Sequence, residues 1–289
     1  MARPARYEYP GGVYYIRARG RCAKEIFRDE SDRVRFLNIL SETVFRFRWL
    51  CHSYCLLNNH YHLILETPYG NLSRGMRQVN GIYTQAFNRK YNRRGALFGE
   101  RFKSIVFEKA RYLLLLNRHV ILNPVRAGLA RDPESWQWSS YLPTIQKVRP
   151  QGFLFTQWIL SRFSRKDRGL AIERYKHFIF GKDEGKLLWR DLKFQVFLGS
   201  DFFIEKIRKM ILMHKMAKCD KTLSVGGGTS TPLDNVVGRE RISKGERDAR
   251  IYDAYINHGY ALSEIAEYLG VHCTTVSRAV KRMERKLLR

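Results

Sequence analysis

The stretch LNNHYHLILE, residues 57–66, decides how the first half of this 289-residue chain is interpreted. It ends one segment rich in β-branched and aromatic residues, 49–57, and begins another, 60–67. The two asparagines between these segments suit a hairpin connection. We therefore predict two antiparallel strands joined by a tight turn.

Alternation along the second of these strands brings two imidazoles to one face. His60 and His62 are expected to project together, while Tyr61 and Leu63 point into the core beneath helices. Two neutral imidazoles ~6–7 Å apart along a strand can converge on one divalent ion. Two histidines at this spacing are more often ordinary surface or core residues, so the pattern alone is weak evidence for a metal site.

Helix-like and strand-like patterns alternate on both sides of the hairpin. We predict strands at 12–19 and 102–107, and helices at 31–48, 72–91 and 110–123, the last stopped by Pro124. The order strand–helix–strand–strand–helix–strand, followed by a helix, predicts an α+β fold. The expected architecture is a ferredoxin-like antiparallel sheet with helices on one face and the other face free for a ligand.

The rest of the chain divides into two zones. Residues 146–238 are expected to be a helical region, with helices near 158–180 and 201–216 and a linker, KTLSVGGGTSTPLD, at 221–234. Residues 239–289 are expected to form a helix-turn-helix domain, which leaves 1–145 as the first domain. In this last zone Ser263 is expected to cap a short helix, Gly270 to make the turn, and Thr274 or its neighbour to cap a second helix.

The second helix of this C-terminal zone has the pattern of a recognition helix. Ile265, Leu269, Val271, Val276 and Val280 are spaced to pack the two helices together. The side chains left exposed for the major groove are Thr275, Ser277, Arg278, Lys281 and Arg282. The alternative is a generic helical hairpin with a solvated basic face.

The charge balance favours a polyanionic partner. Lys and Arg number 53 against 27 Asp and Glu, a net charge of +26, and each phosphate that such a surface neutralises releases condensed counterions. No apolar run approaches the ~18 residues of a membrane-spanning helix. The five cysteines have no zinc or redox spacing and no secretory signal is visible, so we expect reduced thiols and a cytoplasmic location.

Cations and aromatic residues are interleaved on the predicted sheet and helices, as in proteins that stack bases and hold phosphates. Tyr14 and Tyr15 are candidates for base stacking. The candidates for phosphate contacts in the first domain are Arg17, Arg19, Arg77, Arg89, Lys90, Arg101 and Lys103.

Several motifs resemble one family. NNHYHLILE resembles the His-hydrophobic-His motif of the single-tyrosine HUH transposases. The branch called REP-associated tyrosine transposases is similar in further stretches, which are IFRDESDRVRFLNIL, NLSRGMRQVNGIYTQAFNRKY, LFGERFKS, LNPVRAGLA and WQWSSY. The resemblance covers nearly all of residues 10–145, and the C-terminal helix-turn-helix resembles an appendage of some members.

This resemblance implies a chemistry and a partner. It implies Mg²⁺ or Mn²⁺ held by His60, His62 and Asn123, which polarises a phosphate as a Lewis acid. A tyrosine one helical turn before the asparagine would attack, giving a 5′-phosphotyrosine and a free 3′-OH. The implied substrates are imperfect hairpins of single-stranded DNA, with additional duplex DNA bound by the helix-turn-helix. Relatives include monomers and dimers, so monomer and homodimer both stay open.

The chain departs from the family at the nucleophile, because His119 stands four residues before Asn123. Three interpretations follow: cleavage is lost, Tyr112 substitutes from two turns away, or His119 itself attacks or binds the metal. We favour the first. The resulting functional hypotheses are a transposase-family protein that binds hairpin DNA, a non-catalytic sequence-specific regulator, and, more remotely, an RNA-binding protein.

Overall fold

The computed structural model describes residues 7–181, 188–211, 233–238, 242–258, 260 and 262–287. The chain forms two compact units, Met1–Ile207 and Arg208–Arg289. The boundary expected near residue 145 is not a boundary in the structure. Residues beyond it, such as Ile159 and Tyr175, are buried in the same hydrophobic cluster as Leu113 and Leu116.

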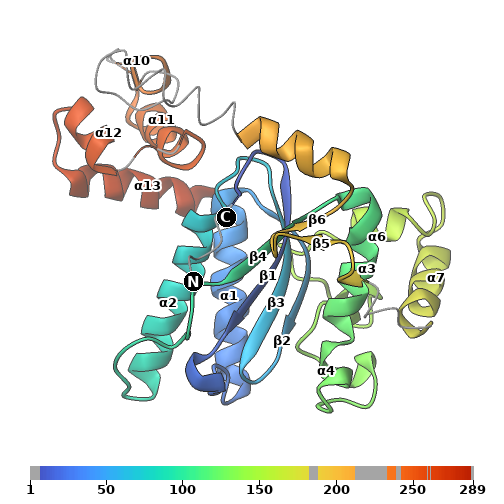
Figure 1. Cartoon of the computed structure of the whole chain (residues 1–289). Helices are drawn as coiled ribbons and strands as arrows, with labels where there is room; N and C mark the ends of the chain where they lie inside the picture. Colours follow the sequence, from blue (N-terminus) through green and yellow to red (C-terminus); the bar gives the residue numbers. More distant parts are fainter. Residues whose placement is uncertain are drawn as a thin grey trace. The chain divides into compact units, whose positions relative to one another are not determined.

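The first unit is built on a six-stranded sheet with the order β2-β3-β1-β4-β6-β5 (Figure 1). The strands are β1 Gly12–Arg19, β2 Leu50–Leu56, β3 His60–Thr67, β4 Lys103–Phe107, β5 Leu192–Lys193 and β6 Phe197–Leu198. β2, β3, β1 and β4 are antiparallel neighbours, which confirms the predicted hairpin and sheet. β6 pairs in parallel with β4, so the region expected to be only helical also adds two short strands.

The outer edge of β2 is covered by later parts of the chain. The amide of Leu56 donates to the carbonyl of Trp138 at 2.9 Å, and the amide of Ser140 donates to Tyr54 at 2.9 Å. Further along the strand, the amide of Phe155 donates to Cys51 at 2.7 Å. The WQWSSY motif thus supplies the backbone partners that an edge strand otherwise lacks.

Helices cover both faces of the sheet. One face carries α1 Glu30–Phe47 and α2 Leu72–Lys90, and α3 Lys109–Ile121 lies on the opposite side (Figure 1). The remaining helices of this unit are η1 Arg21–Ala23, α4 Asn123–Arg126, η2 Pro133–Ser135, α5 Tyr141–Thr144, α6 Gln157–Ser161 and α7 Arg168–Phe180. Residues 201–211, which run past the end of the unit at Ile207, are also helical. The α+β class is confirmed, but the expectation of a free second face is wrong. Leu113, Leu116 and Val120 of α3 bury apolar surface against Ile64 and Tyr15.

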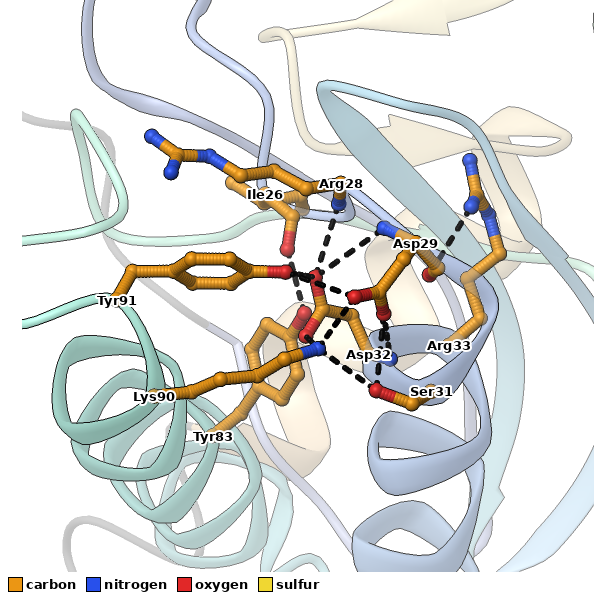
Figure 2. A network of polar contacts seen from close by, with 9 residues as sticks. All are labelled: Ile26, Arg28, Asp29, Ser31, Asp32, Arg33, Tyr83, Lys90 and Tyr91. Carbon is orange, nitrogen blue, oxygen red and sulfur yellow. Dashed lines mark hydrogen bonds and ion pairs between the residues drawn. The ribbon is translucent and has the colours of Figure 1, made fainter.

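A polar network fixes the start of α1 to the end of α2 (Figure 2). α1 begins at Glu30, one residue before the predicted start, because Asp29 and Asp32 form a capping box. Lys90 Nζ lies 2.6 Å from Asp29 Oδ2 and 2.9 Å from Asp32 Oδ1, and the hydroxyl of Tyr91 donates to Asp32 Oδ2 at 2.8 Å. Hydrogen bonds from Lys90 and the backbone hold the pKa of Asp29 well below its ordinary value.

The second unit is helical, with α10 Leu233–Val236, α11 Lys244–Ile256, α12 Leu262–Tyr268 and α13 Cys273–Leu287. Its core includes Ile265, Val276 and Val280, as the apolar spacing predicts. The turn between α12 and α13 contains Gly270 at a φ of +61°, a conformation that favours glycine.

Two capping predictions in this unit are wrong. α12 begins at Leu262, so Ser263 lies within it rather than before it. α13 begins at Cys273, and the imidazole Nδ1 of His272, not Thr274, accepts from the backbone amide of Thr274 at 3.3 Å. Residues 212–232, which contain most of the predicted linker and the end of the helix expected at 201–216, lie outside the described part of the chain.

Two further expectations concern the whole chain. In the part that the structure describes, Cys22, Cys51, Cys55 and Cys273 are free thiols, and Cys219 lies outside it. No helix among the described residues is long and apolar enough to cross a membrane.

Candidate metal and nucleic-acid site

β3 presents His60 and His62 on the sheet face that α3 covers, with ring centroids 4.9 Å apart. Tyr61 and Leu63 are fully buried, as predicted. The Tyr61 ring packs on Phe36 of α1 and its hydroxyl donates to Asn80 of α2, so it lies on the opposite face. The alternation read from the sequence is therefore correct.

The hydrogen bonds of the two imidazoles leave their Nε2 atoms available. His60 Nδ1 lies 2.6 Å from Asn59 Oδ1, and because a carbonyl oxygen only accepts, the Nδ1 atom carries the proton. His62 Nδ1 lies 2.7 Å from the hydroxyl of Tyr15, and His62 Nε2 is buried without a hydrogen-bond partner in the described structure.

Both rings are neutral at pH 7. Burial, reinforced by the charges of Arg17 and Arg19, lowers the pKa of His60 to about 4. Burial also lowers the pKa of His62, and His60, His119 and Arg17 add to the shift. A neutral imidazole is the form that binds metal ions.

α3 carries position 119 to the histidine pair. The centroids of the His119 and His62 rings are 6.2 Å apart. α3 ends at Ile121, before the predicted end, and Asn123 begins α4 with Pro124 in its first turn. Asn123 Nδ2 donates to the carbonyl of His119 at 2.7 Å, which leaves Oδ1 as the atom that a cation would use.

His119 is engaged on both ring nitrogens. Arg126 Nη1 lies 3.0 Å from His119 Nδ1, and because a guanidinium only donates, Nδ1 is the acceptor. The neutral ring then carries its proton on Nε2, which lies 3.5 Å from the Tyr15 hydroxyl. Trp189 packs against the His119 and Tyr15 rings, at centroid distances of 5.1 and 5.6 Å. Neither nitrogen has a lone pair free to attack phosphorus in this arrangement.

Tyr112 faces a different partner. Its side chain is buried in the hydrophobic cluster that contains α3, and its hydroxyl donates to Asp191 Oδ2 at 2.5 Å. Burial and this hydrogen bond raise its pKa to about 12. A phenol held in this way is a poor nucleophile at neutral pH.

The donor set fits a divalent cation. Among the described residues, no group of three or more His, Cys, Asp and Glu side chains is gathered as a metal site. The fit therefore depends on two imidazoles, the unpartnered His62 Nε2, and an amide oxygen of Asn123. The amide oxygen and water suit Mg²⁺ or Mn²⁺, and the two imidazoles are nitrogen ligands of the kind that first-row transition metals bind.

A basic pocket of about 480 Å³ adjoins the histidine pair. In the β1–β3 register Arg17 pairs with His62 and Arg19 pairs with His60, and Lys103 of β4 pairs with Arg17. The charged side chains that line the pocket are Arg17, Arg19, Arg21, Glu100, Arg101 and Lys103. Four residues predicted to contact phosphates thus meet here, and the structure adds Arg21.

The other predicted DNA contacts of the first unit are dispersed. Arg77 lines a second pocket, of about 820 Å³, between α2 and residues 96–102, together with Arg101. Arg89 is exposed at the end of α2. Lys90 is ion-paired with Asp29 and Asp32, so its charge is compensated within the protein.

In the second unit, Thr275 and Arg278 are exposed on α13 and Ser277 is half-buried. Arg282 forms two hydrogen bonds with Asp248 of α11, at 2.7 and 2.8 Å, and so links two helices. The side chain of Lys281 lies outside the described part.

Sequence reasoning missed three residues that pack around the histidines of this site. Tyr15 was considered only for base stacking, although it shares a face of β1 with Arg17 and Arg19. Arg126 belongs to the quoted LNPVRAGLA motif, so its contact with His119 could have been considered from the sequence. Trp189 is distant in the sequence and gave no signal.

The geometry is that of a two-histidine site on a ferredoxin-like sheet, beside cations suited to nucleic acid. Residues 14–120 of the first unit match the family model described as "Transposase IS200 like". The chain is similar to a solved structure described as "Structure of the REP associates tyrosine transposase bound to a REP hairpin", at 15% identity and a TM-score of 0.46, over 54% of this chain and 90% of that one. No curated protein sequence matches the chain.

Proposed function

We propose that this chain binds hairpin-forming single-stranded DNA beside β1 and β3, with a divalent cation held by His60, His62 and Asn123. The observation that carries the proposal is the pair of neutral imidazoles, with available Nε2 atoms, next to a pocket lined by five cations and one carboxylate. IS200-like transposases are generally metal-dependent, and Mn²⁺ or Mg²⁺ is the proposed ion.

In this proposal each group of residues has a separate role. The two imidazoles hold the cation, which when bound supplies Lewis-acid polarisation of a phosphate oxygen. Arg17, Arg19 and Lys103 hold the neighbouring phosphates, because guanidinium and ammonium groups bind them with charge-assisted hydrogen bonds.

Tyrosine-mediated nicking and rejoining is the ancestral chemistry in this proposal, and it is lost here. Position 119 holds an imidazole whose nitrogens face Arg126 and Tyr15. The candidate substitute, Tyr112, donates to Asp191 instead. The first unit then acts as a clamp for hairpin DNA rather than as a strand transferase.

A second candidate function is sequence-specific regulation through duplex DNA. The exposed Thr275 and Arg278 of α13, with Ser277 between them, favour a recognition helix in the second unit. Deletion of residues 239–289 should then weaken binding to duplex DNA but not to a hairpin loop. Equal affinity and specificity with and without these residues, in electrophoretic shifts, would exclude this role.

The main experiment uses a labelled DNA hairpin with a single-stranded 5′ tail, incubated with the full chain and Mn²⁺. We expect a complex that survives native but not denaturing electrophoresis, and that His60→Ala weakens. A covalent adduct in denaturing gels, abolished by His60→Ala, would show that cleavage persists. Tight binding of single-stranded RNA of equal length, with no preference for the hairpin, would instead favour the RNA-binding hypothesis.

A further inference from the structure

The phenol of Tyr15 lies between two of the histidines at the proposed site. Its Oη atom is 2.7 Å from His62 Nδ1 and 3.5 Å from His119 Nε2. The Tyr15 and His62 rings stack, with centroids 5.6 Å apart and planes inclined by 22°. Only 6% of Tyr15 is exposed, so its hydroxyl depends on these protein partners.

His119 and His62 differ in whether the ring nitrogen that faces the Tyr15 hydroxyl is known to carry a proton. Because Arg126 donates to His119 Nδ1, the neutral His119 ring presents an N–H toward the Tyr15 oxygen. His62 has two alternatives: it accepts from the Tyr15 hydroxyl at Nδ1 and carries its proton on Nε2, or it donates from Nδ1 and leaves Nε2 bare. In the first alternative the Nε2–H of His62 would be buried without an acceptor, and in the second the O–H of Tyr15 loses its acceptor. Each costs ~1–3 kcal/mol, so neither is favoured without a cation.

A bound cation would favour the second alternative. A bare Nε2 atom is a metal ligand, and the cation removes the cost of leaving it unpaired. The neighbouring imidazole has the same arrangement, because Asn59 Oδ1 accepts from His60 Nδ1 at 2.6 Å and leaves its Nε2 atom bare. The 4.9 Å between the two ring centroids is compatible with both Nε2 atoms binding one ion.

We infer that Tyr15 is a positioning residue of this site, whose phenol oxygen accepts the Nδ1 proton of His62 and so presents the Nε2 lone pair to a divalent cation. The inference rests on the proposed metal site. It involves no bond making or breaking, only the location of one proton. It also explains why Tyr15 is not itself the nucleophile, because its oxygen lies at the Nδ1 side of the ring, away from the atom that would bind the ion.

The first test locates the imidazole protons directly, with and without Mg²⁺. Long-range ¹H–¹⁵N correlation spectra of the full chain at pH 7 should show Nδ1–H on His60 and Nε2–H on His119 in both conditions, and Nδ1–H on His62 when Mg²⁺ is saturating. In Tyr15→Phe the signal of His62 should shift toward Nε2–H. Tyr61→Phe is the matched control, because it removes the same atom from a buried tyrosine on the opposite face of the sheet. It should leave the three proton positions unchanged.

The second test is Mn²⁺ titration by calorimetry on the same proteins. Loss of an outer partner of a ligating histidine weakens metal binding ~10–100-fold, which we expect for Tyr15→Phe and not for Tyr61→Phe. Nε2–H on His62 in the unaltered chain at saturating Mg²⁺ would overturn the inference, as would a covalent DNA adduct mapped to Tyr15. Mn²⁺ binding that is equal in the unaltered chain and Tyr15→Phe would overturn only the role of Tyr15. No Mn²⁺ binding by the unaltered chain would overturn the metal site itself.

Discussion

Adjacent cations at the end of α2, Arg89 and Lys90, should respond to substitution in opposite ways. Both were predicted from the sequence to contact phosphates. The structure leaves Arg89 exposed, whereas Lys90 Nζ lies 2.9 Å from Asp32 Oδ1 (Figure 2). We therefore expect Lys90→Met to lower the free energy of unfolding with little effect on DNA binding. We expect Arg89→Met to weaken DNA binding with little effect on the free energy of unfolding.

The size of the stability effect follows from the surroundings of Asp32. Its side chain is 3% exposed, and without Lys90 it would keep the backbone amide of Arg28 and the hydroxyl of Tyr91 as donors. Lys90→Met removes two hydrogen bonds to charged groups, but Asp29 is half exposed, so the bond to buried Asp32 dominates the loss, ~1.5–3 kcal/mol when fully buried. Because Lys90 is a third exposed, screening reduces this to about 1 kcal/mol of the free energy of unfolding.

The DNA effect is measured through salt dependence. Each lost contact with a duplex phosphate lowers the slope of log affinity against log salt by ~0.9, so the affinity change between 50 and 200 mM salt shrinks ~3.5-fold. Urea unfolding and fluorescence anisotropy with a labelled hairpin give the two quantities for each variant. A Lys90→Met protein of unchanged stability whose slope falls by ~0.9 would refute the structural role of Lys90.

Three further predictions concern the histidines and the second unit. His119→Tyr should restore a hydroxyl on α3 near His62, so we expect a covalent hairpin adduct at residue 119 with Mn²⁺; a folded, Mn²⁺-binding variant without adduct would show that more than the nucleophile is lost. Burial lowers the pKa of His60 to about 4, so the unfolded chain binds more protons than the folded one between that pH and about 6.5. The contribution of the neutral His60 to the free energy of unfolding should therefore be complete above about pH 6.5 and decrease as the pH drops toward 4. Urea midpoints should fall less steeply with pH in His60→Gln than in the unaltered chain; an equal fall in both proteins would mean that another group causes it. Arg282→Ala should lower the melting temperature of the second unit because the Asp248 pair is lost, while Arg278→Ala should weaken duplex binding at unchanged melting temperature; the opposite pattern would contradict both assignments.

Much of the first unit could be predicted because its elements carry strong periodicity. Alternation along β3 placed His60 and Tyr61 on opposite faces, and helical spacing located α1, α2 and α3. Spacing shows which side of a helix is apolar, but not which face of the sheet that side covers. This is why Leu113 and Leu116 of α3 were recognised as buried while the face they cover was expected to be free.

The positions of the two histidines could be predicted, but the proton positions of their rings could not. His60 and His62 are two residues apart on one strand, so their position on a common face could be derived from the sequence alone. The proton positions of these rings depend on Tyr15 and Asn59, and that of His119 depends on Arg126. Such contacts arise from strand register and from a turn after α3, neither of which leaves a periodic signal.

The covered edge of β2 has a practical consequence for anyone who shortens this chain. A fragment cut after the region that matches the family model would lose the segments at 138–140 and 154–155, together with the β5–β6 addition beside β4. Both margins of the remaining sheet would then expose unpaired amides and carbonyls, a template for aggregation. Truncated proteins intended for crystallisation or spectroscopy should extend through the helical residues 201–211, even when only the histidine pair is of interest.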